Sequence, residues 1–217
     1  MRHRKIRNLD EKMLQVEHHI ISEPQNHRGA WLKEVFEGKE KFFLEIGCGK
    51  GNFITTMAES NPNFAYIGIE GQRTVLYRTL EKIEEKELDN VVTIDQYVDP
   101  GDLEKLFEND ELDGIFLNFS DPWPKERHEK RRLTYGKRLL QYCELIKDKG
   151  FIQFKTDNEG LFAYSIEQIE NEGLYISKLT RDLHNSTCEE RFVTTEYEEK
   201  FKGLGKNINM VKVEVRK

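Results

Sequence analysis

Acidic residues in this sequence follow short apolar runs, at positions where a buried strand would end. Glu45 lies in FFLEI, Glu70 follows AYIGI, and Asp121 follows IFLNFS. Asp95 and Asp99 compete for a third strand end after VVTI, and Asp99 is preferred because it lies closer to the next predicted helix. Ligands of open α/β sheets bind beyond the carboxyl ends of the strands. The sequence therefore predicts that these acids line one site.

The stretch EIGCGKGNF contains three alternating glycines, Gly47, Gly49 and Gly51. They permit a tight turn and close approach of a ligand to the backbone, ahead of a helix. The dinucleotide fingerprint needs a further glycine where this loop has asparagine, which disfavours a nicotinamide cofactor. Glu45 would repel a pyrophosphate but suits a ligand with sulfonium and ammonium groups. E-x-G-x-G-x-G resembles the first motif of class I S-adenosylmethionine methyltransferases, and Glu70 is placed to bind ribose hydroxyls.

Asp121 lies in NFSDPWPKERHEKRR, between a strand end and a block of positive charge. Pro122 and Pro124 stiffen the turn, and DPWP is similar to the D/N-P-P-Y/F/W loop with which amino-methyltransferases hold a base. Trp123 is equally suited to stack on a base or to pack beneath the loop. The basic block suits a phosphate backbone, although an isolated basic cluster is more often a solvated helix face.

Alternating strands and helices must position these residues. Strands are expected at Phe42–Ile46, Ala65–Ile69, Val91–Val98, Gly114–Phe119, Phe151–Lys155, Leu174–Thr180 and Met210–Val215. Helices are expected near 52–60, 73–87, 102–108, 134–147 and 160–171. Apolar strands separated by helices are typical of βαβ units. The prediction is an α/β, Rossmann-like class I methyltransferase fold: a mostly parallel seven-stranded sheet with an antiparallel C-terminal strand and helices on both faces.

The organisation expected is one methyltransferase domain, residues 31–217, preceded by a basic N-terminal arm and lead-in, residues 1–30. Residues 1–9 are expected to be disordered without RNA. The last two predicted strands have no clear helix between them, so they could close as a hairpin.

The composition limits the class of protein. The chain has 217 residues, a formal charge of −6 and a pI near 5.7, which suits one large domain and argues against coating nucleic acid by bulk charge. No run approaches the roughly 20 apolar residues of a membrane span, and a signal-peptide core is missing, so a cytoplasmic location is expected. Cys48, Cys143 and Cys188 fit no metal spacing. Free thiols and no metal are expected.

Four motifs in order, NFSDPWPKERHEKRR, FKTDN, DLHNS and TEYEEKF, resemble the bacterial tRNA (guanine-N7-)-methyltransferases of the TrmB type. The resemblance covers almost the whole chain. It implies an enzyme that methylates N7 of a guanosine in the variable loop of tRNA, with S-adenosylmethionine as the methyl donor. Both a monomer and a homodimer remain open.

The glycine loop and the resemblance together assign roles to matching positions. The cofactor site comprises Glu45, Gly47, Gly49, Gly51, Glu70, Asp99 and Asp121. Asp121 is also assigned to catalysis. Substrate contacts are assigned to Lys125, Asp157, Thr195, Glu196, Tyr197 and Glu198. RNA contacts are assigned to Arg127, His128, Glu129, Lys130, Arg131 and Arg132.

The chemistry of guanine N7 fits an acid-rich site. N7 carries an in-plane lone pair, so no proton must leave before attack, and the enzyme mainly orients the base and supports its developing positive charge. Asp157 and either Glu196 or Glu198 are candidates to accept hydrogen bonds from guanine N1–H and the 2-amino group. Two rival hypotheses are an amino-methyltransferase acting on an exocyclic nitrogen of DNA or RNA, and an RNA-binding module that keeps a relic cofactor fold.

Overall fold

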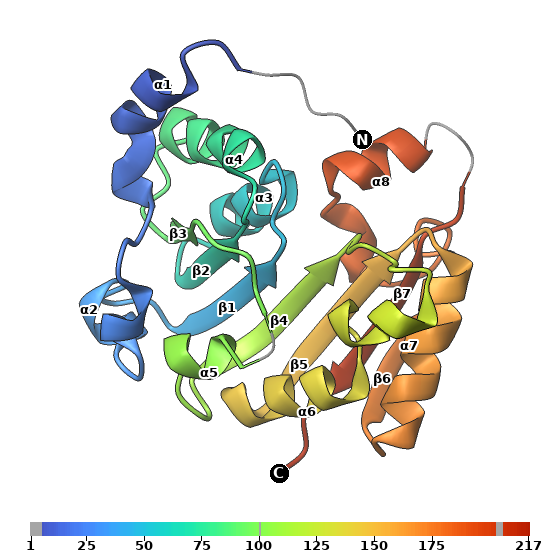
Figure 1. Ribbon diagram of the computed structural model, residues 1–217. Coiled ribbons are helices and arrows are strands. Elements are labelled where there is room, and N and C mark those ends of the chain that lie inside the picture. The colour runs from blue at the N-terminus through green and yellow to red at the C-terminus, as the bar shows by residue number, and fades with distance from the viewer. Residues whose placement is uncertain (1–5, 100, 203–205) are drawn as a thin grey trace.

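The computed structural model describes residues 6–99, 101–202 and 206–217 (Figure 1). One seven-stranded sheet has the order β3-β2-β1-β4-β5-β7-β6. Its strands are β1 (Lys41–Ile46), β2 (Phe64–Ile69), β3 (Val91–Ile94), β4 (Leu112–Asn118), β5 (Ile146–Thr156), β6 (Tyr175–Thr180) and β7 (Asn209–Glu214). Strands β1 to β5 pair in parallel, and β7 pairs antiparallel with both β5 and β6. The predicted sheet is confirmed.

Helices flank the sheet in the described residues. The α-helices are α1 (Leu9–Val16), α2 (Trp31–Glu34), α3 (Asn52–Ser60), α4 (Arg73–Glu85), α5 (Leu103–Leu106), α6 (Gly136–Leu145), α7 (Glu159–Asn171) and α8 (Glu196–Lys202). Short 3-10 helices are η1 (Glu17–His19), η2 (Pro24–His27), η3 (Glu126–Arg131) and η4 (Glu189–Phe192). None of the helices in the described ranges has the length and apolar character needed to cross a membrane.

The alternation of β1 shows why helices cover both faces of the sheet. Phe42 and Leu44 belong to the core shared with α2, α5, α6 and α7, whereas Phe43 packs in a second core with α3. Successive side chains of a strand point to opposite faces, so both faces of β1 are apolar and buried. Strand order reverses between β1 and β4. In open α/β sheets such a reversal marks the ligand crevice.

The lead-in segment packs onto the main body of the protein. Ile6 is buried in a cluster that includes Leu80 of α4. Ile20 forms a parallel bridge with Thr93, which covers the β3 edge of the sheet. The expected disorder of residues 1–9 is therefore wrong from Ile6 onward, and residues 1–5 lie outside the described residues.

Several predicted boundaries differ from the structure. Strand β3 ends at Ile94, because its partner β2 ends opposite at Ile69, and residues 96–99 leave the sheet. The helix predicted to reach 147 gives way to β5 at Ile146. The final two strands pair antiparallel but form no simple hairpin: η4 and α8 lie between them in the chain, and β7 inserts between β5 and β6.

Candidate active site

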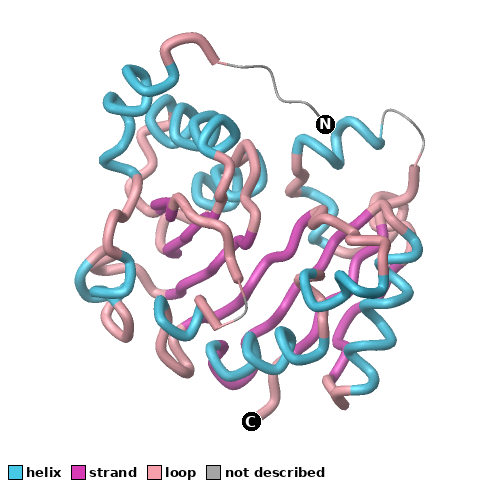
Figure 2. The backbone as a smooth tube through the Cα atoms, in the orientation of Figure 1, coloured by secondary structure: helices cyan, strands magenta, loops and turns pink. Residues whose placement is uncertain are grey.

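A cleft of about 920 Å³ lies at the carboxyl ends of β1, β2 and β4 and is bordered by the start of α8. The segments that leave these strands at this end are loops (Figure 2). The predicted residues that line the cleft are Glu45, Gly47, Gly49, Glu70, Asp99, Asp121, Trp123, Arg131, Thr195, Glu196 and Tyr197. The predicted residues outside its lining are Gly51, Lys125, Arg127, His128, Glu129, Lys130, Arg132, Asp157 and Glu198.

The glycine loop after β1 needs left-handed backbone. Gly47 has φ 75° and Gly51, the residue before α3, has φ 80°, a region that favours glycine. A Cβ on Gly51 would also meet the side chain of Thr79 at 2.6 Å. Gly51 therefore shapes the loop without lining the cleft. Gly47 exposes its backbone to the cleft, with no atom near the position of a Cβ.

Glu45 is a buried carboxylate, 2% exposed, on the floor of the cleft. Its Oε1 accepts a hydrogen bond from Nδ2 of Asn118 at 2.8 Å. Glu45 Oε2 and Asn118 Oδ1 have no hydrogen-bond partner in the described part of the chain. Burial raises the pKa of Glu45 to about 8, and the Asn118 hydrogen bond offsets only part of that effect. Two unpaired buried acceptors fit a ligand that brings cationic N–H donors.

Asn118 was missed by the sequence analysis. Its signal was available, because it is the polar last residue of the apolar run IFLN, at the same sheet edge as Glu45.

The acids after β2 and β3 have different surroundings. Glu70 Oε2 accepts from the backbone N–H of Gly49 at 3.1 Å, so this carboxylate braces the glycine loop. Asp95 lies 3.3 Å from Nε of Arg73 and does not line the cleft. Burial raises the pKa of Asp95 even though Arg73 opposes the shift. Asp99 is exposed and lines the cleft, which favours it as the third cofactor acid.

Asp121 sits at the exposed tip of the loop that follows β4, between two residues with left-handed backbone. Phe119 has φ 53° and Trp123 has φ 39°, values that bulky side chains rarely adopt. Arg132 holds this loop by donating to the carbonyl oxygens of Pro122 at 3.1 Å and Trp123 at 3.0 Å. The prolines therefore share the stiffening of the loop with an inward-turned arginine.

The basic block forms η3 and the residues around it. Its exposed cations are Lys125, Arg127, Lys130 and Arg131. The Arg131 guanidinium lies 4.9 Å from the ring centroid of Trp123, so Trp123 both borders the cleft and supports a cation. Arg132 is only partly exposed, and its guanidinium lies 4.1 Å from the ring of Tyr164. Arg132 therefore contacts other parts of the protein, which differs from the RNA contact predicted for it.

The start of α8 carries the last cleft residues in a capping box. Thr195 Oγ1 accepts from the backbone N–H of Glu198 at 3.0 Å, and Glu198 Oε2 accepts from the N–H of Thr195 at 3.2 Å. The pattern T-x-x-E in TTEYEE was the unused sequence signal for this helix. The capping box turns Glu198 inward, where it is fully buried, and leaves Glu196 and Tyr197 on the cleft.

Two contacts join α8 to the rest of the cleft. Glu196 Oε1 accepts from Lys82 Nζ of α4 at 2.5 Å. The ring of Tyr197 stacks on Phe119, with centroids 5.9 Å apart and an interplanar angle of 22°. Tyr197 therefore packs on the Asp121 loop while its ring stays 43% exposed.

Two features lie away from the cleft lining: Asp157, which is predicted to contact the substrate, and a cluster of possible metal ligands. Asp157 follows β5 and lies 3.5 Å from Nζ of Lys206. Within the described ranges, one group of side chains could hold a metal ion: His18, His19 and Glu84. None of the three lines the cleft.

Solved structures of methyltransferases superimpose on this fold. An antibiotic-related methyltransferase superimposes with a TM-score of 0.62 at 18% identity, covering 86% of this chain and 92% of its own. The 16S rRNA methyltransferase KamB gives a TM-score of 0.61 at 8% identity, covering 83% of this chain and 90% of its own. Together with the acid-lined cleft, these structures define the fold as that of a methyltransferase.

Sequence comparisons narrow this class. Residues 39–211 match the family model described as "Putative methyltransferase". A tRNA (guanine-N(7)-)-methyltransferase from Geobacillus sp. (strain WCH70) is 46% identical over 91% of this chain and 88% of its own length. The protein of that name from Bacillus subtilis (strain 168) is 44% identical over 90% of each chain. The chain belongs to the tRNA (guanine-N(7)-)-methyltransferase family.

Proposed function

We propose that this protein transfers a methyl group from S-adenosylmethionine to N7 of a guanosine in the variable loop of tRNA, in the cytoplasm. Its relatives are named for tRNA as the substrate and for guanine N7 as the methylated atom. The observation that carries the proposal is the placement of Asp121 on a strained loop beside a cleft whose floor holds the unpaired carboxylate oxygen of Glu45.

The residues of the cleft fit the methyl donor. S-adenosylmethionine supplies an electrophilic methyl group on a cationic sulfonium. Glu45 and Asn118 offer unpaired acceptors to an ammonium group, and Glu70 lines the cleft where ribose hydroxyls would lie. Gly47 gives the ligand access to the backbone, and Asp99 borders the side assigned to the adenine. Acids at these positions complement a ligand with two positive centres.

Asp121 and the start of α8 would hold the guanine. Asp121 is the carboxylate at the end of β4, next to β1 at the crevice, where a negative charge stabilises a purine that is becoming cationic. Glu196 faces the cleft and can accept from the N1–H and 2-amino edge of guanine once it leaves Lys82. Asp157 is a second candidate for this edge and lies outside the cleft lining.

The exposed cations around η3 provide a surface for the tRNA backbone. Lys125, Arg127, Lys130 and Arg131 project near the Asp121 loop, where phosphate contacts would fix the register of the RNA without reading its sequence.

The product identifies the reaction. A tRNA transcript methylated by the purified protein should be digested to nucleosides to identify the product, and a second sample cut into oligonucleotides to map its position. N7-methylguanosine from the variable loop is the expected product. N2-methylguanosine or N6-methyladenosine would replace the proposal by its rival, and cofactor binding without any product would favour the RNA-binding module.

A further inference from the structure

A buried lysine lies behind the segment that carries the last cleft residues. Lys155 is at the end of β5, and its side chain is 0% exposed, as is that of Glu198. A buried ammonium is costly unless it is paired and its donors are satisfied. Lysine side chains are almost never fully buried unless they are paired. The complete burial of Lys155 therefore indicates a specific role.

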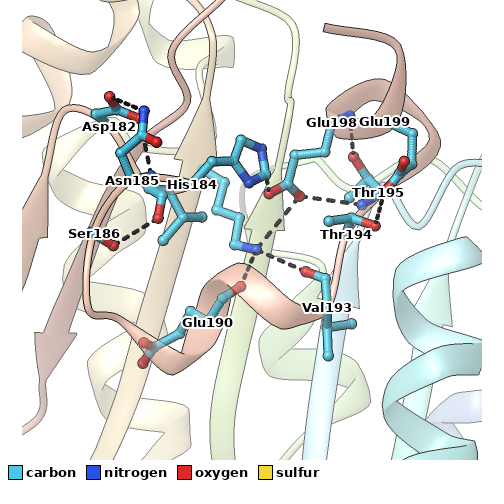
Figure 3. Close-up of polar contacts among 12 residues, drawn as sticks. Asp182, His184, Asn185, Ser186, Glu190, Val193, Thr194, Thr195, Glu198 and Glu199 are labelled. Atoms are coloured by element: carbon cyan, nitrogen blue, oxygen red, sulfur yellow. Dashed lines mark hydrogen bonds and ion pairs between the residues drawn. The ribbon is translucent and has the colours of Figure 1, made fainter. Parts of the chain in front are cut away.

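All three N–H donors of this ammonium have an acceptor on one chain segment. Nζ of Lys155 donates to the carbonyl oxygen of Glu190 at 2.9 Å and to that of Val193 at 3.0 Å. Its third contact is Oε2 of Glu198 at 3.5 Å. Figure 3 shows these two carbonyls and the Glu198 carboxylate converging on one point. Lys155 thus fixes both the η4 turn and the beginning of α8.

The same carboxylate joins the cluster to two other elements. Glu198 Oε2 also accepts from the N–H of Thr195, which closes the capping box. Its Oε1 faces Nε2 of His184 at 3.8 Å (Figure 3). Lys155 itself lies 5.5 Å from the ring centroid of Phe53 in α3. The segment 193–199 is therefore anchored by buried contacts of Glu198 and Lys155.

Lys155 does not line the cleft, but the segment it anchors does, through Thr195, Glu196 and Tyr197. We propose that Lys155 is a positioning residue for methyl transfer: with Glu198 it sets the place of residues 193–199 and so aligns Glu196 and Tyr197 with the target base. This inference rests on the proposed function, because it assigns those side chains to the guanine.

The test is a double-mutant cycle on the buried pair of Lys155 and Glu198. Lys155→Met keeps the stem and removes the ammonium, leaving Glu198 without its cation. Glu198→Gln keeps a capping residue but leaves Lys155 without its anion. Each single variant should lower single-turnover transfer at saturating tRNA and S-adenosylmethionine by about 10²-fold, the effect of displacing a reacting group by about 1 Å. The dissociation constant for S-adenosylmethionine should change by a smaller factor than the rate, because Lys155 acts on the carboxyl of Glu45 only through its charge.

The double variant Lys155→Met/Glu198→Gln should recover part of the lost rate, because no unpaired charge remains buried, although the carbonyls of Glu190 and Val193 still lack their donor. Lys178→Met is the matched control: Lys178 also pairs with Glu190, at 2.9 Å, but is 43% exposed, and its loss should leave the rate unchanged. If Lys155→Met does not fold, the comparison of Glu198→Gln with the double variant gives the same answer.

Three results would overturn the inference. Folded single variants with wild-type rates and only a lower Tm would make the pair a stabilising contact. A double variant no faster than Lys155→Met would indicate that pairing between Lys155 and Glu198 does not set the rate. A rate loss matched by an equal loss of cofactor affinity would place the effect in the cofactor site. A different methylated nucleoside from the wild type would defeat the proposed function alone, because the ratios of variant to wild-type rate still test Lys155.

Discussion

At the scale of residues, the cleft uses similar side chains in distinct environments. Glu45 is buried with one unpaired oxygen, Glu70 braces the glycine loop, and Asp121 is exposed on a strained turn. Glu198 is buried against a lysine and closes a capping box. The surroundings of each carboxylate suit it to a different role: Glu45 to the proposed cation, Glu70 to the glycine loop, Asp121 to the proposed substrate and Glu198 to helix α8.

Asp121→Asn should lower the rate of methyl transfer by about 10²–10³, because it removes one preorganised negative charge beside a cationic transition state while keeping the size of the side chain. Single-turnover kinetics measures the rate, and calorimetry should show a modest change in cofactor affinity at most. Asp89→Asn is the control, since Asp89 is exposed beside Lys39 and away from the cleft lining. Wild-type turnover of Asp121→Asn would remove Asp121 from catalysis.

Glu45 should make the stability of the ligand-free protein depend on pH. Its pKa of about 8 in the folded protein lies above the ordinary 4.5, so folding favours its protonated form. The contribution of Glu45 to the free energy of unfolding is complete below about pH 4.5 and is lost as the pH rises to about 8. Glu45→Gln should abolish this pH-dependent loss of stability, which is on the order of a few kcal/mol.

Thermal unfolding of the wild type and Glu45→Gln across this range measures the difference. The variant should gain stability relative to the wild type as the pH rises. A constant difference between the two proteins would mean that Glu45 stays ionised in the folded state. Calorimetry with S-adenosylmethionine should show tighter binding to the wild type as the pH approaches 8, because a cationic ligand prefers the ionised carboxylate.

At the scale of elements, η3 and the loop before it divide the basic block into two groups. Arg132 turns inward and holds the carbonyls of Pro122 and Trp123, whereas Arg127 and Lys130 are exposed. A single run of positive charge thus both fixes the loop that carries Asp121 and presents cations to the solvent.

Arg127→Gln/Lys130→Gln should weaken tRNA binding and flatten its salt dependence, since each lost phosphate contact reduces the log–log slope by roughly 0.7–0.9. Binding measured over a range of salt concentrations gives the slope, and cofactor affinity should be unaffected. Lys33→Gln/Lys105→Gln is a control of equal charge on α2 and α5, at the other end of β1 and β4 (Figure 1). An unchanged slope in Arg127→Gln/Lys130→Gln would mean that these cations only face solvent.

Elements that depend on a local sequence pattern could be predicted from the sequence. Features that depend on contacts between distant residues could not. Apolar runs located β1 and β4, and therefore the acids at their ends. The run from Val91 to Val98 was read as one strand, but the end of β2 stops the ladder at Ile94. Helix α8 was absent from the predicted helices. The burial of Lys155 could not be predicted, because it depends on acceptors 35 and 38 residues away.

At the scale of the whole molecule, one sheet brings distant segments to a common edge. The glycine loop after β1, the Asp121 loop after β4 and the start of α8 are far apart in sequence, yet all border the cleft. The three described cysteines are unpaired, as expected of free thiols. The parallel half of the sheet supplies the side of the cleft assigned to the cofactor. Helix α8, in the connection between the antiparallel strands β6 and β7, supplies the side assigned to the guanine.

The central claim is that N7 of a guanosine is the atom methylated. It is tested most directly with a tRNA in which the target guanosine alone is replaced by 7-deazaguanosine, a change that removes N7 and leaves the hydrogen-bonding edge intact. Methyl incorporation from S-adenosylmethionine should fall to background on this tRNA, while its binding to the protein stays near that of the unmodified tRNA. Continued methyl incorporation into the 7-deazaguanosine residue would contradict the account and move the reaction to another atom.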